Sequence, residues 1–329
     1  MYRIKEKPEE FIVKEISTIK PGKEGRFTYF LLKKKNYNTM RALERIADAL
    51  HINAKKLGFA GNKDKIAVTE QVCSVPEVEK GRLEKIELTD IEIKYLGKGS
   101  EPISLGDLEG NEFEIIVRNI DKKPKPKTKF INFFGEQRFG KINAPIGKAI
   151  VQKDFKKAVE LMLSNKGPEE IKVRDYIQKN PTNYVGALKV LPIKLLKIYV
   201  HAYQSWIWNK VVGKNPDEDE MPLVGFGTIS ENNNLTDLLT EEGIKPRDFI
   251  IKEIPALSSE GDSRKVIAEA KDLKIGKLEN DELNKEKLEP GVPNSRNKVS
   301  CKKKIKIKFK LPKGSYATEF IKQLFQNLR

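Results

Sequence analysis

The sequence predicts an α+β fold, and three features of the chain support that prediction. Apolar residues recur at every second position in segments such as 85–96 and 111–120, which is the period of a half-buried strand. Helical segments stand among these strands without the regular strand–helix alternation of a doubly wound sheet. The chain has 329 residues, which is long enough for two domains.

The first part of the chain predicts further strands around one helix. Strand-like segments cover 9–16, 26–33 and 67–75. Asn38 and Thr39 offer an N-cap to a helix that follows directly. The apolar face of that helix is expected to contain Met40, Leu43, Ile46, Ala47 and Leu50. After the last strand, 121–129 has two prolines and five lysines, which predicts an extended, solvated segment.

The second part of the chain predicts helices and then a final strand. Helical segments cover 154–164, 169–178 and 192–212, and an acidic loop follows at 214–222. The apolar stripe of the longest helix is expected to contain Leu195, Leu196, Tyr199, Tyr203, Trp206 and Ile207. Residues 301–325 predict a strand, a turn and a helix. One face of that strand is apolar, and the other carries Lys304, Lys306, Lys308 and Lys310.

The charge and composition favour one class of partner. Sixty-three Lys and Arg residues against 47 Asp and Glu give a net charge of +16, which attracts polyanions and makes nucleic acid the leading partner. A generally lysine-rich surface without a specific ligand is the alternative. Two distant cysteines, Cys73 and Cys301, and a polar N-terminus predict a cytoplasmic protein without a membrane span. The sequence shows neither a Cys/His zinc spacing nor a calcium loop, so we expect no metal.

The segment GFAGNKDKIAVTEQ, residues 58–71, places Asp64 between Lys63 and Lys65. Its residues are typical of a turn, in which an Asp often bonds its own main chain. The functional interpretation is a carboxylate that neighbouring cations keep ionised, so that it can attack an electrophilic sugar carbon. The chain has no serine-triad motif and no phosphate-binding loop that would provide a rival site.

The segment NFFGEQRFG, residues 132–140, is a candidate base-handling loop. Phe134 could stack on an extruded base, Asn132 could read its edge, and Arg138 could hold a phosphate. Adjacent phenylalanines are also common in cores, and HAYQSWIWN (201–209) is interpreted as core in the same way. The lysines beside the loop could grip an RNA backbone; they are Lys122, Lys123, Lys125 and Lys127.

Six short segments together resemble one family. They are PEEF (8–11), NTM at the start of the first helix, AGNKDKIAVTEQ, NFFGEQRFG, the Gln-Ser-x-x-x-Asn pattern at 204–209, and LPKGSYAT (311–318). In this order they resemble the TruD family of RNA pseudouridine synthases. The resemblance implies an enzyme that isomerises a flipped-out uridine to pseudouridine, typically uridine 13 of tRNA, without a cofactor or metal.

The resemblance also implies roles for individual residues. Asp64 would be the nucleophile, supported by Lys63 and by Lys5, a basic residue upstream of PEEF. The substrate would be bound by Phe11, Asn132, Phe134 and Tyr316, the last a Tyr where many relatives have Phe. Apart from the resemblance, basic residues of the base-handling loop, of the segment before it and of the last strand are expected to bind RNA; they are Arg138, Lys122, Lys123, Lys125, Lys127, Lys304, Lys306 and Lys308.

The fold that the resemblance implies is the pseudouridine-synthase catalytic fold. A mixed, mainly antiparallel sheet with flanking helices would form from 1–150 and 290–329, and 151–289 would be an inserted α+β TRUD domain. We expect a monomer. Asp64 could attack C1′, add to C6, or act as a base at C2′, and the sequence does not choose among these routes. The alternative functions are a non-catalytic RNA-binding protein or RNA chaperone, or a structural protein of the ribosome.

Overall fold

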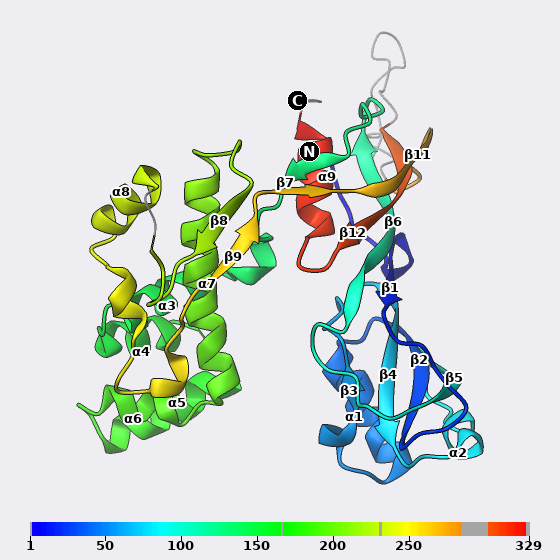
Figure 1. Cartoon of the computed structure of the whole chain (residues 1–329), viewed down its shortest axis with the longest axis horizontal. Coiled ribbons are helices and arrows are strands. Elements are labelled where there is room, and N and C mark those ends of the chain that lie inside the picture. Colours follow the sequence, from blue (N-terminus) through cyan, green and yellow to red (C-terminus); the bar gives the residue numbers. More distant parts are fainter. Residues whose placement is uncertain (1, 166, 230–231, 284–301, 327–329) are drawn as a thin grey trace, which may run out of the picture. The chain divides into compact units, whose positions relative to one another are not determined.

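The protein forms two compact units in the computed structural model, which describes residues 2–165, 167–229, 232–283 and 302–326. Unit 1 consists of Met1–Phe130, Glu269–Ala317 and Ile321–Arg329, and unit 2 of Ile131–Ala268 and Thr318–Phe320. Unit 1 is built around a sheet and unit 2 around helices (Figure 1). The predicted α+β class is therefore confirmed.

The sheet of unit 1 has eight strands within the described residues, in the order β11-β12-β6-β1-β4-β2-β5, with β3 paired to β4. Only the β1–β4 pair is parallel among the pairs whose register is described. The strands are β1 (Phe11–Ser17), β2 (Phe27–Lys35), β3 (Gly58–Phe59), β4 (Val68–Pro76), β5 (Ile91–Gly99), β6 (Leu108–Ile120), β11 (Lys271–Asn280) and β12 (Lys303–Pro312). The helices of this unit are α1 (Thr39–Leu50), α2 (Lys80–Glu84) and α9 (Ala317–Leu324).

One face of this sheet, called the front face below, is buried at its centre. A cross-strand row runs from β12 to β2 through Phe309, Phe113, Val13, Thr69 and Lys34, all buried. Phe113 stacks on Phe309 in this row, and Phe11 on the same face meets Phe113 edge to face. Further along the same face, α1 packs its apolar residues on β2, β4 and β5. The front face therefore carries the larger of two apolar clusters, and a smaller one with Tyr29 and Val72 lies on the opposite face.

The opposite face, called the back face, carries a row of alternating charges. Cross-strand partners along it are Lys310, Glu112, Lys14, Glu70, Lys33 and Glu92, in the order of the strands. Ion pairs join Lys14 to Glu70 and Lys33 to Glu92. Opposite charges placed directly across strands stabilise a sheet modestly, and they leave this face close to neutral.

Unit 2 surrounds the long helix α7 (Figure 1). At Gly147 the main chain of α3 approaches the carbonyl of Tyr199 so closely that no side chain would fit. The helices of the unit are α3 (Asn143–Val151), α4 (Phe155–Leu163), α5 (Pro168–Lys179), α6 (Tyr184–Lys189), α7 (Ile193–Val212) and α8 (Asn233–Glu241). Its strands are β8 (Glu220–Leu223), paired with β9 (Asp262–Lys265), while β7 (Lys129–Ile131) pairs with β10 (Ile267–Glu269) where the chain passes between the units.

Several predicted elements differ from the structure for identifiable reasons. Met40 is exposed, because the buried face of α1 is formed by Ala42 and its helical neighbours. The predicted strand at 85–96 begins only at Ile91, since a short helix and a turn precede it. No long helix of the described chain is apolar enough to cross a bilayer.

The unit boundaries also differ from the predicted joints after residues 150 and 289. Residues 131–150 belong to unit 2, because α3 lies in this segment and packs on α7. Residues 269–283 belong to unit 1, because β11 lies in this segment and is an edge strand of the main sheet. Cys301 lies outside the described residues, while Cys73 is buried under α1, and this burial raises the pKa of its thiol.

A buried cluster of charges in unit 1 holds the start of β1. Arg118 on β6 is 3% exposed, and its guanidinium donates to Glu10 Oε1 at 2.6 and 3.0 Å. The same guanidinium donates to Asp281 and Glu282, beyond the end of β11. Glu10 directly precedes Phe11, so this cluster fixes the place where Phe11 enters the sheet.

Arg118→Met is expected to lower the free energy of unfolding by about 3–5 kcal/mol, because it leaves buried carboxylates without their cation. Lys33→Met removes an exposed pair with Glu92 and is the matched control, with an expected cost of at most about 1 kcal/mol. Urea unfolding followed by circular dichroism measures both. Equal, small shifts in the two variants would show that the Arg118 cluster does not stabilise unit 1.

Candidate active site

Asp64 lies in the loop between β3 and β4 and forms an ion pair with Lys5. Lys5 Nζ donates to Asp64 Oδ2 at 2.7 Å, and the side chains are 14% and 34% exposed, respectively. The same ammonium lies 4.2 Å from the centre of the Phe11 ring. Lys5 has a left-handed main chain with φ of 63°, which few residues other than glycine adopt. The structure thus brings together three predicted site residues, Lys5, Phe11 and Asp64.

Buried polar side chains hold the Asp64 loop against the front face. Lys63 N donates to Thr39 Oγ1 at 2.9 Å, and that hydroxyl donates to Gln71 Oε1 at 3.1 Å. Gln71 Nε2 in turn donates to Gly61 O at 3.1 Å. Thr39 and Gln71 are both fully buried. The loop is therefore fixed at two main-chain positions directly before Asp64.

Lys63 is predicted to support the nucleophile, and its ammonium forms an ion pair with a neighbouring acid rather than with the Asp64 carboxylate. Its Nζ instead donates to Glu15 Oε2 at 2.6 Å, and both side chains are at least 95% buried. Glu15 lies on the front face of β1, and its other oxygen accepts from Val72 N at 3.1 Å. Lys63 therefore anchors the loop to the sheet, because its charge is neutralised within the protein.

Lys34 is a residue of this site that the sequence interpretation missed. It lies on the front face of β2, is 1% exposed, and donates to Asp64 O at 3.0 Å and to Tyr37 O at 2.5 Å. Burial lowers the pKa of Lys34 to about 8, with Asp64 raising it and Lys63 lowering it further. The signal was present in the sequence, since Lys34 continues the buried alternation of β2.

A second cluster, within unit 2, surrounds Asn132 and Phe134. Arg264 on β9 donates from Nε and Nη2 to Asn132 O at 3.1 and 2.8 Å, and from Nη2 to Asn132 Oδ1 at 2.9 Å. Its guanidinium carbon lies 4.0 Å from the centre of the Phe134 ring. Trp208 meets the same ring edge to face at 5.5 Å. Arg264 therefore covers the aromatic face that was predicted to stack on a base.

The Gln-Ser-x-x-x-Asn pattern of α7 positions this second cluster. Asn209 and Phe134 exchange two hydrogen bonds, at 2.9 and 3.0 Å, which fix the main chain at Phe134. Arg138 Nε donates to Ser205 Oγ at 3.3 Å, and its guanidinium lies 5.6 Å from the Phe134 ring. Gln204 donates to Val224 O and to Ser259 Oγ. The polar residues of α7 therefore hold neighbouring loops.

The remaining predicted substrate residues are placed as follows. Phe11 is 1% exposed, with its ring covered by Phe113 and by the Lys5 ammonium. A base could stack on Phe11 only after Lys5 moves. Tyr316 is the N-cap residue of α9 in the sequence-predicted turn, and it is partly exposed.

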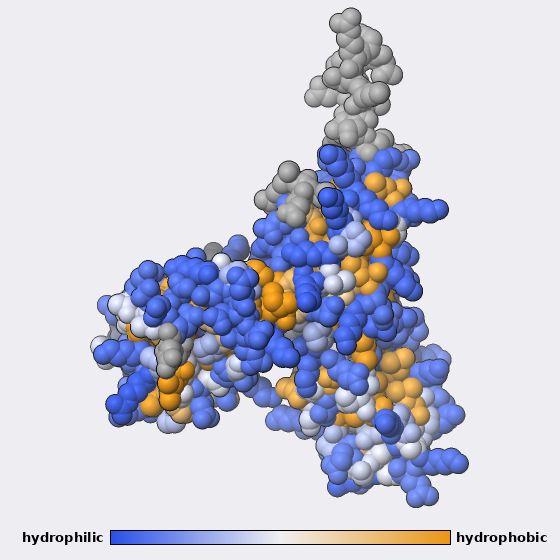
Figure 2. Space-filling model, turned by 45° about the horizontal axis from the view of Figure 1, so that its top comes forward, coloured by the Kyte–Doolittle hydropathy of each residue, from blue (hydrophilic) through white to orange (hydrophobic). Residues whose placement is uncertain are grey.

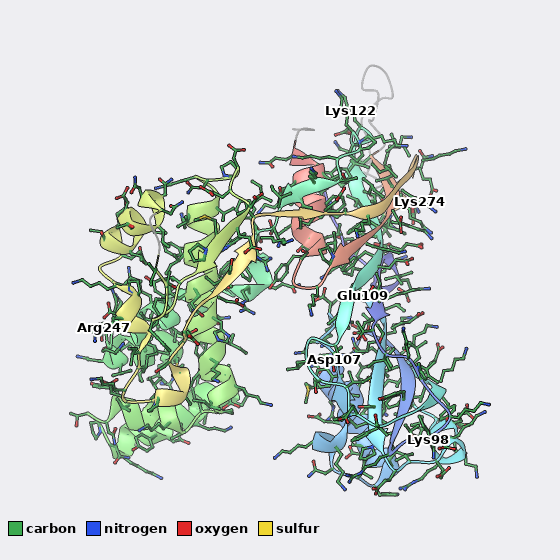
Figure 3. All side chains as sticks on the ribbon, viewed as in Figure 1. Lys98, Asp107, Glu109, Lys122, Arg247 and Lys274 are labelled. Atoms are coloured by element: carbon green, nitrogen blue, oxygen red, sulfur yellow. The ribbon has the colours of Figure 1, made fainter. Side chains whose placement is uncertain are left out.

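The predicted RNA-binding lysines fall into two groups. Lys122, Lys123, Lys125 and Lys127 are exposed in the segment after β6, where Figure 3 labels Lys122. Lys306 and Lys308 are on the back face, where both pair with Glu114, and Lys304 pairs with Glu282. Ion pairs therefore offset only part of the charge of the β12 lysine strip, because Lys306 and Lys308 share the single carboxylate of Glu114.

Comparison with known proteins gives consistent matches over almost the whole chain. The family model described as tRNA pseudouridine synthase D (TruD) matches residues 2–176, 169–225 and 220–324. A protein of Aquifex aeolicus named tRNA pseudouridine synthase D is 31% identical over 385 residues, covering 98% of each chain. A Methanosarcina acetivorans protein that carries this name provisionally is 29% identical, covering 98% of this chain and 92% of the relative.

A solved structure supports the same assignment. The crystal structure of a candidate tRNA pseudouridine synthase D from Methanosarcina mazei matches with a TM-score of 0.71 at 27% identity, covering 98% of this chain and 93% of that one. The predicted pseudouridine-synthase fold is thereby confirmed. On the strength of a family model that spans both units, this chain belongs to the TruD family.

Proposed function

We propose that this protein is a tRNA pseudouridine synthase that isomerises uridine 13, with Asp64 as the nucleophile. Membership of the TruD family and relatives named for pseudouridine synthesis in tRNA support the activity and the substrate. The observation that carries the assignment of Asp64 is its ion pair with Lys5 on a loop fixed by buried hydrogen bonds. A neighbouring cation favours the ionised form that a carboxylate nucleophile needs.

The geometry of Asp64 fits attack by one particular oxygen. Lys5 binds Oδ2, and Oδ1 has no hydrogen bond among the described residues. In the route through C1′, Oδ1 forms a bond to C1′ as the C1′–N1 bond breaks and uracil leaves as an anion. After the base turns, C5 bonds to C1′ and the C1′–Oδ1 bond breaks, which releases the carboxylate. The C5 proton then passes to water and N1 takes up a proton, which gives neutral pseudouridine. Addition to C6 and the glycal route would use the same ionised carboxylate.

We propose that the Asn132 cluster handles the extruded base. Asn132 would hydrogen-bond an edge of uracil, and the Phe134 ring would stack on the base while Arg264 keeps its hydrogen bonds to Asn132. Base–aromatic stacking is worth about 1–3 kcal/mol, which offsets part of the cost of unstacking the uridine. Arg264 orders Asn132 through three hydrogen bonds, so it would set the orientation of the residue that reads the base.

Asp64→Asn is expected to abolish pseudouridine formation while leaving tRNA binding near the wild-type level, because only the nucleophilic oxygen is lost. Tritium release from tRNA labelled at C5 of uridine measures turnover, and a transcript with cytidine at position 13 tests the site. Asp48→Asn, an exposed carboxylate on α1, is the control and should be fully active. Retained turnover in Asp64→Asn would end the proposal.

Arg264→Met is expected to reduce turnover about 10- to 100-fold, the effect of losing a charge-assisted hydrogen bond that orders Asn132. Arg247→Met removes an exposed arginine of the same unit and is expected to have no effect (Figure 3). The same tritium assay measures both. If the two variants match in rate, Arg264 has no part in base handling.

The salt dependence of tRNA binding should distinguish the two groups of lysines. Replacing both Lys125 and Lys127 by Ala should reduce the slope of log K against log salt by about 1.5, since each phosphate contact contributes about 0.7–0.9. The same double replacement of Lys306 and Lys308 should change the slope by less, because Glu114 pairs with both and offsets one of their two charges. Filter binding at several salt concentrations measures the slopes. The reverse order would restore the β12 strip as the RNA-binding surface.

A further inference from the structure

Lys34 is a buried lysine, and membership of the TruD family does not assign a role to it. It occupies the front face of β2, opposite Thr69 on β4 in the cross-strand row that contains Val13 and Phe113. Only 1% of the residue is exposed, in a sheet whose exposed lysines lie on the back face. Because taking an ammonium out of water is costly, a lysine at such a position needs a compensating interaction.

The compensating interactions of Lys34 are with the main chain of the site. Its Nζ donates to Tyr37 O, ahead of α1, and to Asp64 O, in the nucleophile loop. The hydroxyl of Thr69, directly across the strands, has no hydrogen-bond partner among the described residues and does not contribute to holding the ammonium. Lys34 thus connects the residue that carries the chemistry to the segment that leads into α1.

We propose that Lys34 is a positioning residue for the isomerisation, which fixes the main chain of Asp64 and adds a positive charge behind its carboxylate. This inference rests on the proposed function of Asp64. Lys5 binds the carboxylate from the partly exposed side, and Lys34 holds the same residue from the buried side. The two lysines therefore have separate tasks: Lys5 pairs with the carboxylate oxygen, and Lys34 sets the main chain from which the carboxylate projects.

The charges around Lys34 make its effect dependent on pH. Asp64 favours its protonated form, while burial and the charge of Lys63 oppose it, so the pKa of Lys34 is about 8. Lys63 is itself paired with Glu15, and Lys5 is paired with Asp64. Below about pH 8 the ammonium is present and the loop is held. Activity should therefore fall as the pH rises through this pKa and the charged donor is lost.

Loss of the Lys34 proton should lower activity but raise the stability of the folded protein. These opposite effects separate a positioning role from a purely structural one. The pKa of Lys34 is lower in the folded protein than in the unfolded chain, so the unfolded chain binds the proton more tightly. The contribution of this group to stability therefore rises from about pH 8 to about pH 10.5. Deprotonation of Lys34 therefore does not destabilise the fold between about pH 8 and about pH 10.5. A fall in activity over this interval would not result from unfolding caused by Lys34.

The test measures kcat and KM of the full-length protein on C5-tritiated tRNA from about pH 6.5 to about pH 9.5. The wild-type kcat is expected to decline with a midpoint near 8. Lys34→Met should lower kcat about 10- to 100-fold at neutral pH, as expected for a lost hydrogen bond from a charged group, and should remove the decline. KM should change little, because Lys34 is buried and cannot touch RNA.

Thr69→Val is the matched control, since it alters the cross-strand neighbour of Lys34 without altering the ammonium or its two acceptors. It should keep the wild-type kcat and pH profile. A wild-type kcat that stays constant through pH 8 would overturn the inference, and this result requires no variant to fold. A Lys34→Met enzyme with the wild-type kcat would overturn it as well. If Asp64→Asn also stays active, the proposed function itself has failed, whereas an inactive Asp64→Asn confines the failure to Lys34.

Discussion

The ion pair between Lys5 and Asp64 is the interaction on which the rest of the site depends. At 34% side-chain exposure it adds little to stability, because water screens it. Its value is positional: it occupies Oδ2, leaves Oδ1 without a hydrogen bond among the described residues, and places an ammonium over Phe11. The buried contacts below it have the same purpose, since each holds the loop from which Asp64 projects.

The two faces of the main sheet have separate tasks. The front face combines an aromatic row with buried polar residues, and these anchor the Asp64 loop. The back face carries one cross-strand row of alternating charges and, elsewhere, an apolar cluster that includes Tyr29 and Val72. The face of the molecule drawn in Figure 2 is mainly hydrophilic, with smaller hydrophobic patches among the polar residues. The lysines at 122, 123, 125 and 127 are exposed as well.

The sequence correctly predicted features that depend only on residues close to one another along the chain. Asn38 does cap α1 by accepting from Arg41 N, and the apolar alternation of β12 is buried as expected. The partners of Lys63 and Lys34 could not be predicted in this way, because they depend on the register of β1, β2 and β4. Arg264 was missed for a similar reason: it lies 132 residues from Asn132 in the sequence. The predicted unit boundaries differ from those of the structure because α3 packs on α7 and β11 pairs with β12. These contacts join residues far apart in the sequence, so local patterns do not predict them.

Mapping pseudouridine in cellular tRNA tests the central claim most directly. Carbodiimide labelling and reverse transcription would compare cells that lack this protein with cells given the wild-type or the Asp64→Asn chain. We expect the stop at position 13 to disappear without the protein, to return with the wild type, and to stay absent with Asp64→Asn. A stop that returns with Asp64→Asn would contradict the account, because the carboxylate at position 64 would then not be the group that reacts with uridine.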